Sequence, residues 1–252
     1  MGSQYDAFAE DYDRWLFSDE RLTGEPQLKE LGSRLKRLGS RPQVLDCACG
    51  TGVLVWALAR HGYAVCGSDE SRGMIDRARK RLDQAGLDVR LEVCPWERLG
   101  EEFGPRFDLV VCGGNAIGHC RDEAEMLDSL RGMRSVLKPG GMLILDTRNW
   151  EKYRKDRVRF ESFSSPRVRD GIRCIVLYVR TTPESWSDPH LTEVVFILEQ
   201  DGRVSQRSYP IVYWPFRYAD LIARIRAAGF DAVESDHSEN QDGYVVEARA
   251  HP

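Results

Sequence analysis

One stretch early in the chain limits the possible folds more than any other. Residues 44–59 read as a short apolar strand, a tight turn with two glycines and then a helix. Glycines suit such a turn because a ligand can approach the backbone closely and because positive φ is open to them. The start of the helix offers unpaired N–H groups and the positive end of its dipole. The stretch therefore predicts a ligand-binding turn in an α/β sheet.

The residues around this turn indicate which ligand it binds. The spacing is not the G-x-G-x-x-G of dinucleotide sites, because Ala48 occupies the first glycine position. Asp46 lies in the turn, where a carboxylate repels a pyrophosphate but accepts hydrogen bonds from an ammonium group. The strand predicted over residues 64–69 ends on Asp69, which is placed to hold a pair of ribose hydroxyls. A ligand with a ribose, an ammonium group and no phosphate is S-adenosylmethionine.

Residues 46–52, Asp-Cys-Ala-Cys-Gly-Thr-Gly, resemble the cofactor loop of class I S-adenosylmethionine-dependent methyltransferases, in the form typical of glycine N-methyltransferase-like enzymes. The resemblance implies a Rossmann-like α/β fold with a seven-stranded sheet, helices on both faces and an antiparallel β insertion over the active site. It also implies S-adenosyl-L-methionine as cofactor and S-adenosyl-L-homocysteine as product. The cofactor contacts that we expect are Tyr12, Asp46, Ala48, Gly50, Gly52, Asp69, Glu70, Pro95, Trp96 and Gly113.

Length and composition fit one methyltransferase domain over residues 1–252. The net charge of −4 argues neither for a nucleic-acid partner nor for an anionic membrane. No apolar run approaches the ~20 residues that span a bilayer. The seven scattered cysteines predict buried thiols in a cytoplasmic protein, and no second Cys/His pair at metal-site spacing accompanies Cys47 and Cys49, so no metal is expected. The oligomeric state stays open between a monomer and a small homo-oligomer.

We divide the domain into four consecutive parts. They are an N-terminal helical lid (1–40), the cofactor-binding core (41–150), an antiparallel insertion that covers the substrate (151–216), and a C-terminal helix with a strand hairpin (217–252).

Aromatic residues supply several of the expected contacts. Tyr5, Phe8, Tyr12 and Trp15 fall on one face of a helix in the lid. Such a stripe is commonly core packing, but in the resembling family this opening folds over the cofactor. Tyr12 is therefore interpreted as a cofactor contact and Trp15 as a substrate contact. Trp96 follows the strand predicted over residues 89–93, where its ring can stack on adenine for about 1–3 kcal/mol.

The loop after the strand predicted over residues 107–112 supplies the catalytic candidates. Ligands in open α/β sheets bind at the carboxyl ends of strands, which places residues 113–119 near the reacting methyl group. The loop is similar to the Gly-Asn-x-x-x-His segment of glycine N-methyltransferase-like enzymes, and the resemblance makes Asn115 and His119 site residues. A neutral amine needs no strong base, whereas His119 can take a proton from a ring N–H or a hydroxyl.

The substrate contacts come from two later segments. Residues 146–150 match the Asp-x-Arg-Asn-aromatic segment of glycine and sarcosine methyltransferases, in which the arginine grips the substrate carboxylate. A guanidinium fork suits a planar carboxylate or the edge of a heterocycle, which makes Arg148 a substrate contact. Tyr213 and Trp214 belong to the aromatic stretch 209–218 that we expect to close over the substrate.

These features favour an enzyme that methylates a nitrogen of a small molecule by in-line displacement. The acceptor is a glycine- or sarcosine-like amine or an N-heterocyclic precursor in natural-product biosynthesis. Two alternatives stay open. One is an RNA or protein methyltransferase that uses the basic residues 148–180, and the other is a non-catalytic S-adenosylmethionine-binding regulator.

Overall fold

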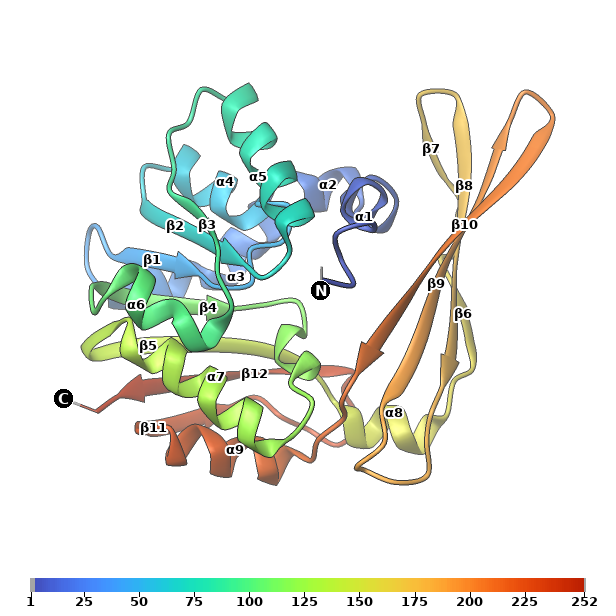
Figure 1. The fold of residues 1–252 in the computed structure, drawn as a ribbon. Helices are drawn as coiled ribbons and strands as arrows, with labels where there is room; N and C mark the ends of the chain where they lie inside the picture. Colours follow the sequence, from blue (N-terminus) through green and yellow to red (C-terminus); the bar gives the residue numbers. More distant parts are fainter. Residues whose placement is uncertain (1–2, 252) are drawn as a thin grey trace.

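The computed structural model describes residues 3–251, which form two β-sheets and the helices that cover them (Figure 1). The helices are α1 (Ala9–Leu16), α2 (Asp19–Leu22), α3 (Glu25–Arg37), α4 (Val53–Arg60), α5 (Arg72–Gln84), α6 (Leu99–Phe103), α7 (Glu123–Ser135), α8 (Trp150–Asp156) and α9 (Tyr218–Ala227), with 3-10 turns η1 (Trp96–Arg98) and η2 (Ala116–His119). The strands of the larger sheet are β1 (Gln43–Asp46), β2 (Ala64–Asp69), β3 (Leu91–Val93), β4 (Phe107–Cys112), β5 (Leu137–Arg148), β11 (Phe230–Ser235) and β12 (Gly243–Ala250). Those of the smaller sheet are β6 (Phe160–Ser162), β7 (Arg167–Arg169), β8 (Ile172–Thr181), β9 (His190–Gln200) and β10 (Arg203–Tyr213).

The larger sheet has the strand order β11-β12-β5-β4-β1-β2-β3. Neighbouring strands from β5 to β3 run parallel, whereas β12 runs antiparallel to both β5 and β11. The order reverses between β1 and β4, and ligands bind at such a switch point, beyond the carboxyl ends of the strands. The predicted seven-stranded Rossmann-like sheet is confirmed, including its reversed final strand.

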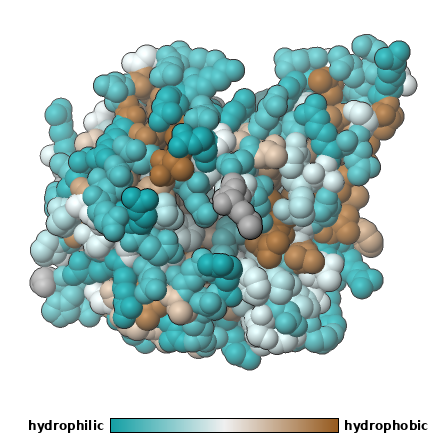
Figure 2. Space-filling view, in the orientation of Figure 1, coloured by the Kyte–Doolittle hydropathy of each residue, from teal (hydrophilic) through white to brown (hydrophobic). Residues whose placement is uncertain are grey.

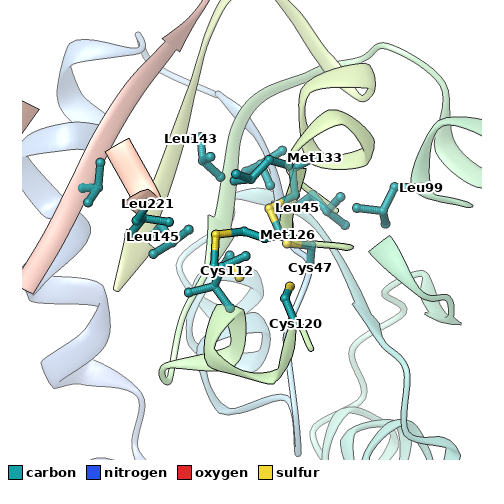
Figure 3. Close-up of a cluster of buried hydrophobic side chains, with 14 of the residues drawn as sticks. Leu45, Cys47, Leu99, Cys112, Cys120, Met126, Met133, Leu143, Leu145 and Leu221 are labelled. Atoms are coloured by element: carbon teal, nitrogen blue, oxygen red, sulfur yellow. The ribbon is translucent and has the colours of Figure 1, made fainter. Parts of the chain in front are cut away.

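Helices cover both faces of this sheet, as predicted. On one face, Leu31 and Leu35 of α3 and Leu58 of α4 pack against Val44 of β1 and Leu109 of β4. On the other face, α6, α7 and α9 close over the sheet, and Figure 3 shows side chains of this buried cluster around Cys47, Cys112 and Cys120. Because both faces are covered, the central strands are apolar along nearly their whole length.

The smaller sheet is antiparallel and lies beside the carboxyl ends of the larger one, with α1 between them (Figure 1). Its strand order is β10-β9-β8-β6, and β7 also pairs with β8. Side chains alternate along β8: Cys174 and Val176 are buried, whereas Ile175 is exposed. Apolar side chains gather on this lobe in Figure 2. Phe160 of β6 and Val168 of β7 are 67% and 70% exposed.

Two buried carboxylates on α1 connect the antiparallel sheet to the part of the molecule built on the larger sheet. The Asp11 carboxylate accepts hydrogen bonds from Arg207 and from the Tyr209 hydroxyl of β10, the latter at 2.8 Å. The Asp13 carboxylate, two residues on, pairs with Arg77 and Arg81 of α5. Helix α1 therefore connects the antiparallel sheet to the cofactor-binding core.

Some local details differ from the sequence-based prediction. Residues 138–141 form a bulge within β5, because Phe107 pairs with Leu137 and Leu109 already pairs with Met142. The short elements α6, α8, β6 and β7 were not predicted. Within residues 3–251, no helix combines the length and apolar composition that a membrane crossing requires.

Candidate active site

A cavity of about 520 Å³ opens at the carboxyl ends of β1, β2 and β4. Figure 2 shows the molecule hollowed between its two lobes in this region. Every predicted cofactor contact except Gly52 lines the cavity: Tyr12, Asp46, Ala48, Gly50, Asp69, Glu70, Pro95, Trp96 and Gly113. Gly52 serves packing instead, because a Cβ there would lie 2.8 Å from the Cβ of Ala78 on α5.

The glycine turn is held by the carboxylate at the end of β2. The backbone N–H groups of Gly50 and Ser71 each donate to one oxygen of Asp69, both at 2.9 Å. Each oxygen keeps a second lone pair, which leaves Asp69 able to accept from ribose hydroxyls. The backbone N–H of Ala48 donates to Asp46 at 3.3 Å. Burial raises the pKa of Asp46 to about 7 and that of Asp69 to about 6.

A third carboxylate adds to the negative character of the cavity. The Asp146 side chain at the end of β5 accepts the backbone N–H groups of Gly114 and Asn115 at 3.0 and 3.1 Å and also lines the cavity. The repulsion from Asp69 and Asp146 helps to raise the pKa of Asp46. Asp46 is buried, Asp69 is half-buried and Asp146 is exposed. Carboxylates gathered around one cavity favour a cationic ligand, so these acceptors fit the sulfonium and ammonium groups of S-adenosylmethionine.

The remaining walls fit the other parts of that cofactor. The indole N–H of Trp96 donates to the carbonyl of Cys47 at 2.7 Å, which fixes the ring at the cavity wall. Arg21 also lines the cavity, with its guanidinium stacked 4.4 Å from the ring centroid of Phe17. This cation can pair with the carboxylate of the cofactor. We did not single out Arg21 from the sequence, because a charged residue in a polar helical segment carries no distinctive pattern.

Residues 4–6 cross the cavity beyond the carboxyl ends of the strands. The Asp6 carboxylate accepts from the Ser71 hydroxyl at 2.7 Å and from the backbone N–H of Gly73 at 3.1 Å, both on α5 or its cap. The Gln4 amide oxygen accepts from the backbone N–H of Val212 on β10 at 2.9 Å. Tyr5 lies between these anchors and lines the cavity. Residues 4–6 therefore form a strap from one lobe to the other.

His119 is held as a neutral imidazole. Its Nδ1 lies 2.9 Å from the carbonyl of Val212, which can only accept, so Nδ1 carries the proton. Nε2 then accepts a hydrogen bond from the Tyr5 hydroxyl, also at 2.9 Å. Burial lowers the pKa of His119 to about 4. The ring stacks on Tyr213 with centroids 4.7 Å apart. Sequence reasoning placed Tyr5 in the aromatic stripe but missed its role as the partner of His119.

Arg148 lies within an aromatic enclosure. Its guanidinium carbon is 4.6 Å from the ring centroid of Tyr213, 5.4 Å from that of Tyr153 and 5.7 Å from that of Trp150. Its Nη1 is buried and has no hydrogen-bond partner among residues 3–251. A buried cationic donor without a partner is costly unless an anion pairs with it. The enclosure can therefore bind an acidic group of a substrate.

Asn115 positions this arginine. The residue has a left-handed backbone with φ of 61°, and its side-chain oxygen accepts from the Thr147 hydroxyl and from the backbone N–H of Arg148, both at 3.0 Å. Its Nδ2 is buried without a partner in the described chain. The oxygen therefore holds the end of β5, and only the Nδ2 is left for a substrate.

The structure corrects the predicted substrate contact of Trp15. Trp15 is only 1% exposed, and its indole N–H donates to Asp11 at 3.1 Å, so the side chain belongs to the core and does not face a substrate. The reason is that its helix face packs against the antiparallel sheet. Trp214 is half-buried, and its backbone N–H donates to the carbonyl of Gly118 at 2.7 Å, which joins the end of β10 to η2.

Comparisons with known proteins agree with this geometry. Residues 44–141 match a family model described as a methyltransferase domain. The glycine/sarcosine N-methyltransferase of Parasynechococcus marenigrum (strain WH8102) is 30% identical over 245 residues, which cover 94% of this chain and 82% of that protein.

Solved structures resemble the whole chain. An S-adenosylmethionine-dependent methyltransferase from Clostridium acetobutylicum ATCC 824 superposes with a TM-score of 0.76 at 15% identity, covering 99% of this chain and 100% of that one. The S-adenosylmethionine-bound CalS10, an amino pentose methyltransferase from Micromonospora echinaspora involved in calicheamicin biosynthesis, gives 0.72 at 19% identity, covering 90% and 91%. At these identities the likeness concerns the fold.

Proposed function

The chain belongs to the class I S-adenosylmethionine-dependent methyltransferases, and we propose that it methylates a nitrogen atom of a small molecule that carries an acidic group. When bound, S-adenosyl-L-methionine supplies an electrophilic methyl group and leaves as S-adenosyl-L-homocysteine. The protein's part is to place an amine in line with the breaking S–C bond and to exclude water.

The observation that carries this proposal is the buried Nη1 of Arg148, for which residues 3–251 supply no hydrogen-bond partner. Arg148 contacts the ring of Tyr213, which stacks on His119, and His119 lines the cofactor cavity. A carboxylate paired with Arg148 therefore leaves the rest of a small amine next to the cavity. The name of the glycine/sarcosine N-methyltransferase relative supports a carboxylated amine as acceptor.

The site residues fit the chemistry of an amine nucleophile. The nitrogen lone pair forms the new N–C bond, and the proton that the amine then sheds passes to solvent. This reaction needs no strong base, which agrees with a neutral His119 whose two nitrogens already have partners in Val212 and Tyr5. We propose that His119 and Tyr5 contact and orient the acceptor, and that the ring of Tyr213 packs against it.

A second candidate acceptor is a planar N-heterocycle or a sugar nitrogen of natural-product metabolism. The aromatic faces of Trp150, Tyr153 and Tyr213 around Arg148 favour a flat ring. CalS10, an amino pentose methyltransferase involved in calicheamicin biosynthesis, supports a sugar nitrogen as the acceptor.

The basic residues of the 148–180 stretch give less support to an RNA or protein acceptor. Arg157 pairs with Glu184, Lys152 with Asp156, and Arg169 with Asp19. Arg148 and Arg180 point into the protein, where Arg148 contacts the buried ring of Trp150 and Arg180 the half-buried ring of Tyr153. Positive charges neutralised in pairs or turned inward form a poor surface for a polyanion.

Steady-state kinetics on matched amines test the proposal. We expect methyl transfer to glycine or sarcosine in preference to methylamine, which lacks the carboxylate. Arg148→Met should raise the KM for the acid roughly tenfold or more, since a tenfold change is about 1.4 kcal/mol. Arg173→Met, at an exposed arginine on β8, is the control and should leave the KM unchanged. An unaltered KM in Arg148→Met would remove the arginine from its role, and cofactor binding without transfer to any amine would favour the regulator.

A further inference from the structure

Among the buried polar side chains whose hydrogen-bonding capacity no described residue fills, three lie together on the antiparallel sheet. They are Arg180, His190 and Thr192, which are 6%, 1% and 2% exposed. Within residues 3–251, the Nε of Arg180, the Nε2 of His190 and the Oγ1 of Thr192 have no hydrogen-bond partner. Buried polar atoms in folded proteins are nearly always paired, so three such atoms together need an explanation.

The three side chains share one face of the antiparallel sheet. Arg180 of β8 lies directly opposite Thr192 of β9, and His190 is two residues before Thr192 on the same strand. His190 in turn lies opposite Tyr213 of β10. The His190 ring packs 5.5 Å from that of Trp150 on α8, which covers this face.

This cluster is continuous with the enclosure of Arg148. The ring of Tyr153 on α8 lies 5.4 Å from the guanidinium carbon of Arg148 and 5.6 Å from that of Arg180. Trp150 and Tyr213, which adjoin His190, also contact Arg148. A molecule whose acidic group pairs with Arg148 therefore has the cluster within reach of its next atoms.

Charge distinguishes the cluster from Arg148. Arg180 is neutralised by Glu161, because a carboxylate oxygen of Glu161 lies 2.5 Å from Nη2. Burial, with the nearby arginines, lowers the pKa of His190 to about 4, so its ring is neutral. Thr192 carries no charge. The cluster thus presents polar hydrogen-bonding atoms without a net charge, which suits a hydroxyl, carbonyl or amide group better than a second carboxylate.

We propose that Arg180, His190 and Thr192 form a specificity subsite for an uncharged oxygen-bearing group of the methyl acceptor. The acceptor is then an amino acid longer than glycine, with its carboxylate on Arg148 and a hydroxyl or amide at its far end. The inference rests on the proposed function of Arg148. A site built to hydrogen-bond a polar group rejects an isostere without it, because the buried donors stay unpaired.

Isosteric substrate pairs test the subsite. L-Threonine with L-valine, and L-asparagine with L-leucine, differ at equal size by the oxygen-bearing group. Each is measured for methyl transfer and, separately, for binding by thermal shift in the presence of S-adenosyl-L-homocysteine. We expect the oxygen-bearing member to have at least a tenfold higher kcat/KM in at least one pair, and to give the larger thermal shift.

Substitutions in the protein assign that preference to the cluster. Thr192→Val removes only the hydroxyl and should bring the kcat/KM of the preferred substrate down toward that of its isostere, while Thr192→Ser should retain the preference. Because the Thr192 hydroxyl has no partner in the described chain, Thr192→Val should not lower the melting temperature. Thr181→Val, at an exposed position of β8, is the matched control and should change neither value.

The outcomes separate this inference from the function beneath it. Equal use of both members of each pair, a preference that survives Thr192→Val, or glycine as the best acceptor would overturn the subsite and leave the methyltransferase assignment standing. A thermal shift with S-adenosyl-L-homocysteine but with none of the four amino acids would also overturn the subsite and leave the methyltransferase assignment standing. No shift with S-adenosyl-L-homocysteine would contradict the proposed function itself.

Discussion

The ring of Tyr213 lies 4.6 Å from the guanidinium of Arg148 and so links this buried cation to the cofactor cavity. The same ring stacks on His119 at 4.7 Å, and His119 lines that cavity. An acceptor anchored on Arg148 is therefore separated from the cofactor by little more than one aromatic side chain. A reactive complex therefore needs the amine to extend past this ring until its nitrogen lies about 3–3.5 Å from the methyl group.

The strap over the cavity depends on a glycine. A Cβ on Gly73 would lie 2.6 Å from the backbone oxygen of Asp6, so Gly73→Ala should push the strap away from α5. We expect the Kd for S-adenosylmethionine to rise roughly tenfold, or about 1.4 kcal/mol, by titration calorimetry. Gly32→Ala, where a Cβ meets no atom within 4 Å, is the control. Equal affinities in the two variants would show that the strap does not hold the cofactor.

Cofactor affinity should depend on the ionisation of Asp46. Burial raises its pKa to about 7, well above the ~3.9 of an unfolded chain, so its buried carboxyl lowers the stability of the free protein as pH rises through that interval. A cationic ligand favours the ionised form, and binding should therefore tighten between about pH 5.5 and pH 7.5. Calorimetry across this range should show the trend in the wild type and a weaker one in Asp46→Asn. A Kd independent of pH in the wild type would contradict the placement of the cationic groups near Asp46.

Helix α1 should contribute to stability through Asp11. The carboxylate accepts from Arg207, Tyr209 and Trp15, and Asp11→Asn leaves some of these donors unpaired. Chemical denaturation should show a loss of about 1–3 kcal/mol in the free energy of unfolding. Asp170→Asn, which breaks an exposed ion pair with Arg14, should cost less than about 1 kcal/mol. Similar losses in both variants would mean that burial of Asp11 adds nothing.

Substitutions that remove or replace the ring of Trp96 test its assigned contact with adenine. Trp96→Ala should weaken S-adenosylmethionine binding by about 1–3 kcal/mol, whereas Trp96→Phe keeps an aromatic face and should lose less. Fluorescence-independent calorimetry is the suitable measurement, because tryptophan itself is removed. If Phe and Ala weaken binding equally, the ring does not stack and the indole N–H to Cys47 is the important contact.

The sequence predicts those parts of the molecule that depend on local pattern. Strands β2 and β4 lie at the residues expected, because each is a mostly apolar run bounded by turn residues. The cofactor turn was recognisable because Asp46, Gly50 and Asp69 act within one strand–turn–helix unit and its neighbour.

Features that depend on contacts between residues far apart in the chain could not be predicted from local sequence pattern. Trp15 and Tyr12 share the same stripe, yet only the position of the antiparallel sheet decides that Trp15 is buried while Tyr12 lines the cavity. The same holds for Tyr5, whose hydroxyl meets His119 across more than a hundred residues of chain. Short elements such as α8 have too few residues for a periodic signal.

The most direct test of the account is methyl transfer from isotope-labelled S-adenosylmethionine to amines with and without a carboxylate, with the product position read by mass spectrometry. We predict label on the nitrogen of a carboxylated amine, little on its decarboxylated counterpart, and loss of that difference in Arg148→Met. Label on oxygen or on RNA, or equal label on both amines, would contradict the central claim.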